Sequence, residues 1–251
     1  MRTVFQWIMS LLFVIQMYVS MVLIALFFLP QMMVKRDRVF VTVHTYTSWV
    51  RWTASWMIGL KSEIRGTPPT DEVIIASKHQ SFFDIILITN VTPRPKFIMK
   101  KEILWTPIVG YVAKAMGCVA VDRGKGGQAI KKMVADVSSG AVAPGQLIIF
   151  PQGTRVAAGA HKKYKIGTGV LYKETGQPCV PAATNVGVFW KRHGIMRYPG
   201  MAVMEFLPAI DPGLEMGDFM VAMETAVEEG SNRLMAEAGF VLEAPHEIPD
   251  N

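Results

Sequence analysis

The chain has 251 residues, a formal net charge of +6 and a sequence pI near 9.3. Hydrophobic residues make up 51% of it and the mean hydropathy is +0.28, which is too apolar for an ordinary soluble enzyme. The length allows one α/β domain with a modest appendage, and the positive charge favours an anionic partner such as lipid or a phosphate ester. The basic residues are not gathered in one tract and no nucleic-acid-binding motif is present, so we expect no nucleic-acid partner.

The apolar excess is concentrated at the N-terminus. No charged residue occurs between Thr3 and Val34, and about 20 apolar residues suffice to cross a bilayer. The stretch is too long for a signal peptide, only Arg2 precedes it, and no small-x-small cleavage site precedes the KRDR sequence that follows. We therefore expect a retained membrane anchor. A helix that spans the bilayer and a helix that lies in one leaflet both fit this length.

A second helical pattern covers residues 39–60. It carries Trp49, Trp52 and Trp56 at spacings of three and four, which places them on one face of a helix. Tryptophan near basic residues is typical of a membrane interface. The alternative is that the tryptophans pack this helix onto the globular domain. In either case the two apolar segments predict a helical hairpin.

The sequence RGTPPT, which ends at Thr70, is the best linker candidate, and the globular part of the chain is expected to start near Gly66. Residues 1–65 would then form the anchoring hairpin and residues 66–251 the functional domain. Apolar runs alternate with helical patterns in this domain, which is typical of an α/β fold with functional residues at the strand ends. Strands are expected over residues 73–76, 96–99, 118–121, 147–150 and 179–187, and helices over residues 83–90, 106–116, 127–138, 167–175 and 218–238.

The octapeptide SKHQSFFD, residues 77–84, places His79 and Asp84 five positions apart. On one helix, five residues would turn the two side chains about 140° away from each other, so they meet only if the chain bends between them. A bend is expected, because a strand pattern precedes and a helical pattern follows. Two compatible interpretations result. Ser81 and Asp84 form a capping box at the helix start, or Asp84 orients His79 in a catalytic dyad.

The sequence LIIFPQGTR is the second informative stretch. A strand is expected to end at Phe150, after which Pro151 and Gly153 turn the chain. Backbone N–H groups at such a turn hold anions, and a guanidinium binds phosphate through two hydrogen bonds. Thr154 and Arg155 are therefore candidates for a phosphate site. The alternative is an ordinary surface arginine on a turn.

Other candidate groups follow two further strands. Lys100 and Lys101 come directly after one, and Arg123 follows the next. No phosphate-loop or dinucleotide-binding spacing is met, so neither ATP nor a dinucleotide is expected. The histidines are scattered and form no metal-binding cluster, so we expect no metal. Cys118 and Cys179 are interpreted as small core residues of a reduced, cytoplasmic chain.

Four stretches, in chain order, resemble the glycerolipid acyltransferase family, in particular the 1-acyl-sn-glycerol-3-phosphate acyltransferases. HQSFFD resembles the family's H-x-x-x-x-D block, and KKEILWTPIVG followed by VAVDRGKG resembles the second block. FPQGTR resembles the F-P-E-G-T-R block and CVPAA the final V-P block. The resemblance covers roughly residues 70–185, and the first and third blocks in this order make it specific.

The resemblance implies a fold and a reaction. The fold is α/β, a mixed sheet flanked by helices. The reaction transfers an acyl group from acyl-CoA or an acyl carrier protein to the free hydroxyl of 1-acyl-glycerol 3-phosphate (lysophosphatidate), giving phosphatidate. His79 would be the general base and Asp84 the residue that orients it. Arg155 and Lys100 are the best choices for the acceptor's phosphate, with Lys101 as the alternative to Lys100. The implied substrate-binding residues are Lys100, Lys101, Arg123, Gln152, Gly153, Thr154 and Arg155.

The family needs neither a metal nor a bound cofactor, and the catalytic domain is expected on the cytoplasmic side of a bacterial inner membrane. One residue departs from the family's pattern, because Gln152 stands where the family usually has glutamate. Glutamine keeps a hydrogen-bond acceptor but carries no charge. Alternative functions are the same transfer to another lysolipid or to glycerol 3-phosphate, a thioesterase, or a non-catalytic lipid-binding membrane protein. The intact His79 and Asp84 argue against the last of these.

Overall fold

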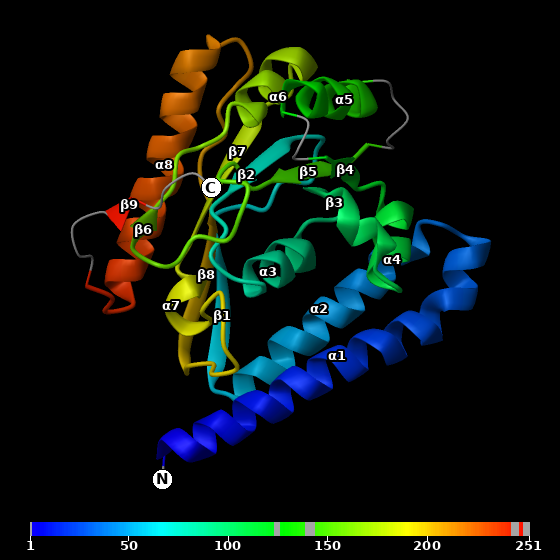
Figure 1. Ribbon diagram of the computed structural model, residues 1–251, viewed down its shortest axis with the longest axis vertical. Helices are drawn as coiled ribbons and strands as arrows, with labels where there is room; N and C mark the ends of the chain where they lie inside the picture. The colour runs from blue at the N-terminus through cyan, green and yellow to red at the C-terminus, as the bar shows by residue number, and fades with distance from the viewer. Residues whose placement is uncertain (1, 123–125, 139–143, 242–245, 248–251) are drawn as a thin grey trace.

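The computed structural model describes residues 2–122, 126–138, 144–241 and 246–247. Its main feature is a seven-stranded sheet in the order β1-β8-β7-β2-β5-β3-β4 (Figure 1). The strands are β1 Leu60–Arg65, β2 Ile74–Ser77, β3 Pro95–Lys100, β4 Val119–Val121, β5 Gln146–Ile149, β7 Cys179–Thr184 and β8 Gly200–Phe206. A separate short pair consists of β6 Ala160–His161 and β9 His246–Glu247.

The sheet is mixed, as expected. Strands β7, β2, β5, β3 and β4 pair in parallel, whereas β8 runs antiparallel to β7 and β1 pairs in parallel with β8. All five strands predicted from the sequence are present. Strands β1 and β8 were not predicted. The sequence of β1, LKSEIR, is mostly polar because β1 lies at the edge of the sheet, where only Leu60 is buried.

Helices cover both faces of the sheet (Figure 1). They are α1 Arg2–Val34, α2 Arg38–Met57, α3 Phe83–Val91, α4 Val109–Met116, α5 Gly126–Ser138, α6 Gly167–Thr175, α7 Val186–Phe189 and α8 Met216–Glu237, with a 3₁₀ helix η1 at Lys101–Trp105. In β2, Ile75 packs with the core under α1, α2 and α3, whereas Ile74 and Ala76 pack with the core under α6 and α8. This alternation buries the central strand on both sides.

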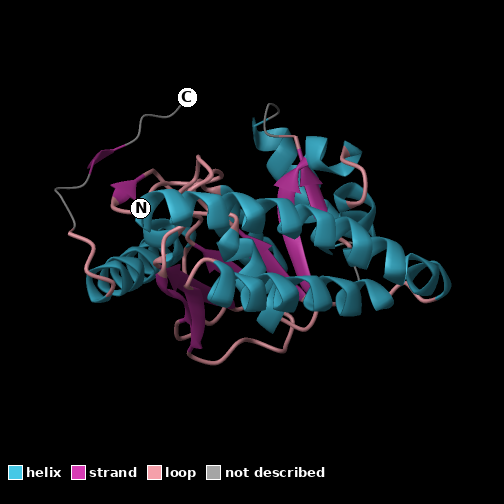
Figure 2. Ribbon diagram, turned by 90° about the horizontal axis from the view of Figure 1, so that it is seen from below, coloured by secondary structure: helices cyan, strands magenta, loops and turns pink. Residues whose placement is uncertain are grey.

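The N-terminal hairpin packs on the sheet domain and contributes to its core. Figure 2 shows α1 and α2 side by side in front of the sheet. Phe13 of α1 and Val50 of α2 are buried in the same cluster as Phe83 of α3. The sheet also begins at Leu60, before the Gly66 boundary expected from the sequence. Strand β1 therefore lies in the segment that the sequence assigned to the anchoring hairpin.

The outer side of the hairpin is apolar and exposed. Helix α1 is the one helix in the described part of the chain that is long and apolar enough to cross a membrane, and only 17% of its most apolar window is buried. Trp49, Trp52 and Trp56 of α2 form an exposed ladder, with ring centroids 5.3 and 5.7 Å apart. The tryptophans therefore do not pack α2 onto the domain, and their exposure is typical of a membrane interface.

Candidate active site

The candidate site lies where three parallel strands end at the same edge of the sheet. His79 follows the central strand β2, Lys100 is the last residue of β3, and the FPQGTR segment follows β5. Ligands of open α/β sheets bind at this edge, outside the carboxyl ends of the strands. The topology therefore brings together three of the four stretches singled out in the sequence.

His79 and Asp84 meet across a bend between β2 and α3. Oδ2 of Asp84 lies 3.2 Å from Nδ1 of His79, and it also accepts hydrogen bonds from the backbone N–H groups of Gln80 and Ser81, both at 2.6 Å. Ser81 Oγ in turn accepts from the N–H of Phe83 at 3.2 Å. The carboxylate thus caps the start of α3 and orients the imidazole with the same oxygen. The contacts that the capping interpretation and the dyad interpretation each require are thus present together.

The imidazole of His79 is held by a second contact as well. Its ring stacks on Phe150 at the end of β5, with centroids 4.0 Å apart and planes inclined by 19°. The carbonyl of His79 accepts a hydrogen bond from the N–H of Val156 at 2.7 Å, which ties the HQSFFD segment to the FPQGTR segment. The Asp84 side chain is fully buried, whereas that of His79 is 13% exposed. Because Nδ1 faces Asp84, Nε2 is the ring nitrogen left for a substrate.

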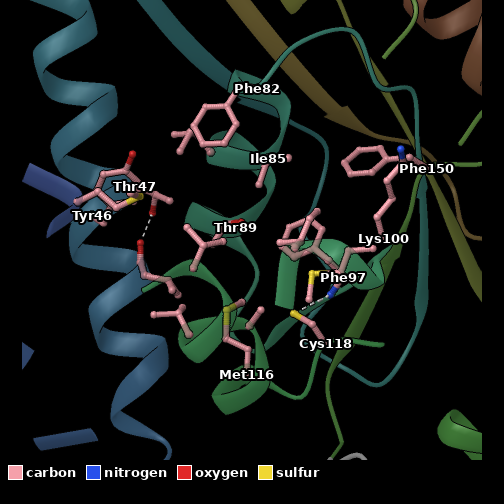
Figure 3. Close-up of a pocket in the computed structure, with 18 of the residues that line it drawn as sticks. Tyr46, Thr47, Phe82, Ile85, Thr89, Phe97, Lys100, Met116, Cys118 and Phe150 are labelled. Carbon is pink, nitrogen blue, oxygen red and sulfur yellow. Dashed lines mark hydrogen bonds between the residues drawn. The ribbon is translucent and has the colours of Figure 1, made fainter. Parts of the chain in front are cut away.

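A cavity of about 570 Å³ opens beside His79 and extends between the hairpin and the sheet domain (Figure 3). Its walls are mostly apolar and come from α1, α2, α3, β3 and α4. Figure 3 shows Tyr46 and Thr47 of α2 on one side, and Lys100 reaching toward Phe150 on the other. The charged lining residues are Lys100, Arg155 and Arg192, and no lining residue is acidic among those the structure describes. The cavity thus combines an apolar interior with cationic groups.

The structure places most of the substrate-binding residues predicted from the sequence at this cavity. Gly153, Thr154 and Arg155 line it together with Lys100. Lys101 instead pairs with Asp122, with Nζ 2.6 Å from Oδ2, so Lys100 is favoured over Lys101 for a substrate contact. Arg123 lies outside the described residues.

Gln152 does not line the cavity. Its side chain is buried and its Nε2 donates to the carbonyl of Lys162 at 3.3 Å. The amide therefore joins the FPQGTR turn to the segment that follows it. Its position does not support the acceptor contact that the resemblance implies.

Comparison with known proteins identifies the family. The model of a family described as acyltransferase matches residues 61–185. The chain belongs to this acyltransferase family. A relative, the 1-acyl-sn-glycerol-3-phosphate acyltransferase of Pseudomonas aeruginosa, is 26% identical over 213 residues, which cover 84% of this chain and 83% of the relative. The alpha form of that enzyme in Mus musculus is 28% identical over 163 residues, which cover 62% of this chain and 57% of the relative.

A solved structure confirms the fold of this acyltransferase. The crystal structure of the 1-acyl-sn-glycerophosphate acyltransferase PlsC from Thermotoga maritima superposes with a TM-score of 0.80. The match covers 94% of this chain and 98% of that chain at 20% sequence identity. The α/β fold with its long N-terminal helix is therefore shared over nearly the whole length.

Arg192 and Cys118 are among the residues of the acyltransferase that line the cavity and were not predicted as site residues. Arg192 comes from the loop after α7, beyond the matched blocks; the signal available in the sequence was the cation-rich stretch WKRHGIMR. Cys118 also lines the cavity, and its Sγ accepts from the N–H of Phe97 at 3.4 Å. Burial raises the pKa of the Cys118 thiol to about 11, so it stays protonated at neutral pH and is a poor nucleophile.

Proposed function

We propose that this acyltransferase moves a fatty acyl group from an acyl thioester to the free hydroxyl of lysophosphatidate, giving phosphatidate. The observation that carries the proposal is the His79–Asp84 pair beside an apolar cavity whose charged lining residues are all cations. An apolar cavity suits an acyl chain, and cations suit a phosphate ester. The printed names of the relatives support the same acceptor.

The dyad supplies general-base catalysis in this proposal. With Nδ1–H donating to Asp84, Nε2 of His79 accepts the proton of the acceptor's hydroxyl as the oxygen attacks the thioester carbonyl. The tetrahedral intermediate then collapses, the C–S bond breaks, and the imidazolium returns the proton to the departing thiolate. A positioned base contributes about 10²–10⁴-fold to the rate, and the buried carboxylate stabilises the imidazolium. No covalent bond to the enzyme is formed.

The cationic lining residues would hold the acceptor. Lys100 and Arg155 line the cavity with His79, and neither is paired with a carboxylate in the described part of the chain. A charge-assisted hydrogen bond to phosphate contributes about 1.5–3 kcal/mol. The backbone turn at Gly153 and Thr154 lies beside them. These groups would place the hydroxyl of the acceptor near Nε2.

The apolar walls would hold acyl chains. Met21 and Ile24 of α1 face the cavity along with residues of α2 and α3, so a chain in the cavity would lie between the hairpin and the sheet domain. Burial of each methylene contributes about 0.8 kcal/mol. The exposed apolar side of α1 supports attachment to a membrane, and we propose the cytoplasmic side of a bacterial inner membrane for the catalytic domain.

The test is an assay of the purified full chain with acyl-CoA or acyl carrier protein as donor. The acceptors would be lysophosphatidate, other lysolipids and glycerol 3-phosphate. We expect thiol release that depends on lysophosphatidate and yields phosphatidate in equal amount. Release without an acceptor would make the protein a thioesterase. If no thiol were released with any of these acceptors, a non-catalytic lipid-binding role would remain.

A further inference from the structure

A basic loop beyond the matched family blocks reaches the cavity. It follows α7, and no acidic residue occurs between Val186 and Met204, a stretch that contains Lys191, Arg192 and Arg197. Arg192 lines the same cavity as His79. The loop therefore brings cations to the candidate active site from a part of the chain that the family model does not cover.

Arg197 holds this loop in place. The residue is only 7% exposed, and Nη1 donates to the carbonyls of residues 194–196 at 2.9 to 3.1 Å. The guanidinium lies over the ring of Trp190, 4.4 Å from its centroid. The backbone of Arg197 is bound to α1, because its N–H donates to Ser10 Oγ at 3.0 Å and its carbonyl accepts from Gln6 Nε2 at 2.9 Å. These contacts hold the loop in place without a ligand. The guanidinium of Arg197 is engaged within the loop and is therefore not a candidate for binding substrate.

Arg192 differs from Arg197 in having an available guanidinium. In the described part of the chain its side chain makes no hydrogen bond and no ion pair, and the residue is exposed. Its carbonyl accepts a hydrogen bond from Arg155 Nη1 at 3.3 Å, so the residues lie next to each other. Together with Lys100 they place three cations around a cavity that no acidic residue lines within the described ranges. Such a cluster attracts a dianion strongly.

We propose that Arg192 is a substrate-binding residue that, together with Arg155, holds the phosphomonoester of the acyl acceptor. The inference rests on the proposed function and adds a binding group outside the recognised blocks. Two substrates carry phosphate. In lysophosphatidate the phosphate is on the carbon next to the reacting hydroxyl, whereas in the donor a pantetheine arm separates the phosphates from the thioester. A residue that shares a cavity with His79 is therefore matched to the acceptor's phosphate.

The experiment is steady-state kinetics of the full chain with Arg192→Ala and Arg192→Lys. For Arg192→Ala we expect the KM for lysophosphatidate to rise about tenfold or more, which corresponds to ~1.4 kcal/mol, with kcat and the KM for the donor changed by less than about twofold. Arg192→Lys should raise this KM less, because an ammonium keeps the charge but cannot form the bidentate hydrogen bonds of a guanidinium. Because Arg192 is exposed, thermal melting should be unchanged.

The matched control is Lys191→Ala, which removes the same charge from the same loop. Lys191 does not line the cavity, and its Nζ lies over the ring of Tyr198, 5.5 Å from the centroid. We expect the KM for lysophosphatidate to change by less than about twofold. A second control is 1-monoacylglycerol, which lacks the phosphate; any slow turnover of it should be the same in Arg192→Ala and in the unmodified protein.

Four outcomes would overturn the inference. An unchanged KM for lysophosphatidate in Arg192→Ala would overturn it and leave the proposed function intact. A rise confined to the donor's KM would assign Arg192 to the donor's phosphates. An equal rise of the KM for lysophosphatidate in Lys191→Ala and Arg192→Ala would mean that the net positive charge of the loop, and not a contact with Arg192, attracts the substrate. Failure of the unmodified protein to form phosphatidate would overturn the proposed function and this inference together.

Discussion

Asp84 performs two tasks through one oxygen. Oδ2 accepts two short backbone hydrogen bonds at the start of α3 and contacts Nδ1 of His79. Hydrogen bonds to a charged, buried acceptor are stronger than neutral ones. Stability of the β2–α3 bend and orientation of the ring are therefore coupled.

Substitutions in the dyad should separate these two tasks. His79→Ala is expected to lower kcat by about 10³-fold or more, while the fold loses the stacking on Phe150 and the contact of Nδ1 with Asp84. Asp84→Asn is expected to lower both kcat and the melting temperature, because the neutral amide weakens the cap by about 1–3 kcal/mol and no longer stabilises an imidazolium. Kinetics and thermal melts of both variants check this. Full activity of Asp84→Asn would refute the dyad.

Gln152 lies outside the lining of the cavity, although the resemblance implies a substrate contact for it. It is buried, its Nε2 donates to the carbonyl of Lys162, and it is next in the chain to Gly153, which does line the cavity. We expect Gln152→Leu to lower stability by about 1 kcal/mol, the contribution of one hydrogen bond, and to change the acceptor's KM by less than about threefold. Denaturation and kinetics measure the two effects. A tenfold rise in KM would show that the amide does reach the acceptor.

At the scale of elements, a buried ion pair connects β2 to α8. Lys78 directly precedes His79, its side chain is 1% exposed, and Nζ lies 2.6 Å from Oε2 of Glu228. The hydroxyl of Tyr164 donates to the other carboxylate oxygen at 2.9 Å. Burial, and secondarily the charge of Glu228, raises the pKa of Tyr164, which keeps this donor protonated. Helix α8 thus supports the segment that carries the dyad.

Removing one partner of this ion pair should lower the free energy of unfolding more than removing both partners. Lys78→Met leaves the Glu228 carboxylate, which is 16% exposed, without its cation, and we expect a loss of about 3 kcal/mol in the free energy of unfolding. The double variant Lys78→Met with Glu228→Met should recover most of this loss, because no buried charge is left unpaired. Denaturation of both variants provides the test. A double variant less stable than Lys78→Met would contradict it.

At the scale of the whole molecule, the hairpin has a buried side and an exposed side. Phe13 is fully buried and contacts Trp190 edge-to-face at 5.6 Å, whereas Trp52 and Trp56 are 56% and 58% exposed. The buried side is part of the core of the sheet domain, and the exposed side is available to lipid. The same two helices therefore serve folding and membrane attachment.

Substitutions on the exposed side should affect membrane binding, whereas substitutions on the buried side should affect stability. Replacing Trp52 and Trp56 together by alanine is expected to reduce sedimentation with liposomes and leave the melting temperature in detergent nearly unchanged. Phe13→Ala is expected to lower the free energy of unfolding by about 3–5 kcal/mol, because it opens a cavity in the core. If the tryptophan variant melted much earlier and still sedimented fully, the exposed ladder would not be a membrane contact.

The sequence by itself determined the family blocks, the strand–bend–helix around His79 and most of the elements. These features depend on residues close together in the chain. Ser81 and Asp84 make the hydrogen bonds at the start of α3, and apolar periodicity marks the buried strands. Strands β1 and β8 were missed, since the polar edge strand β1 is recognisable only by its pairing with β8.

Only the tertiary structure decided which side chains reach the cavity. Lys100 and Lys101 are identical neighbours, and Lys101 is less suited to a substrate contact because it pairs with Asp122, the residue that follows β4. Arg192 joins Arg155 because the loop after α7 is anchored on α1, at the far end of the chain. Lys100 ends β3 and Lys101 begins η1, so which of the two faces the cavity is set by contacts with distant segments, which local sequence does not encode.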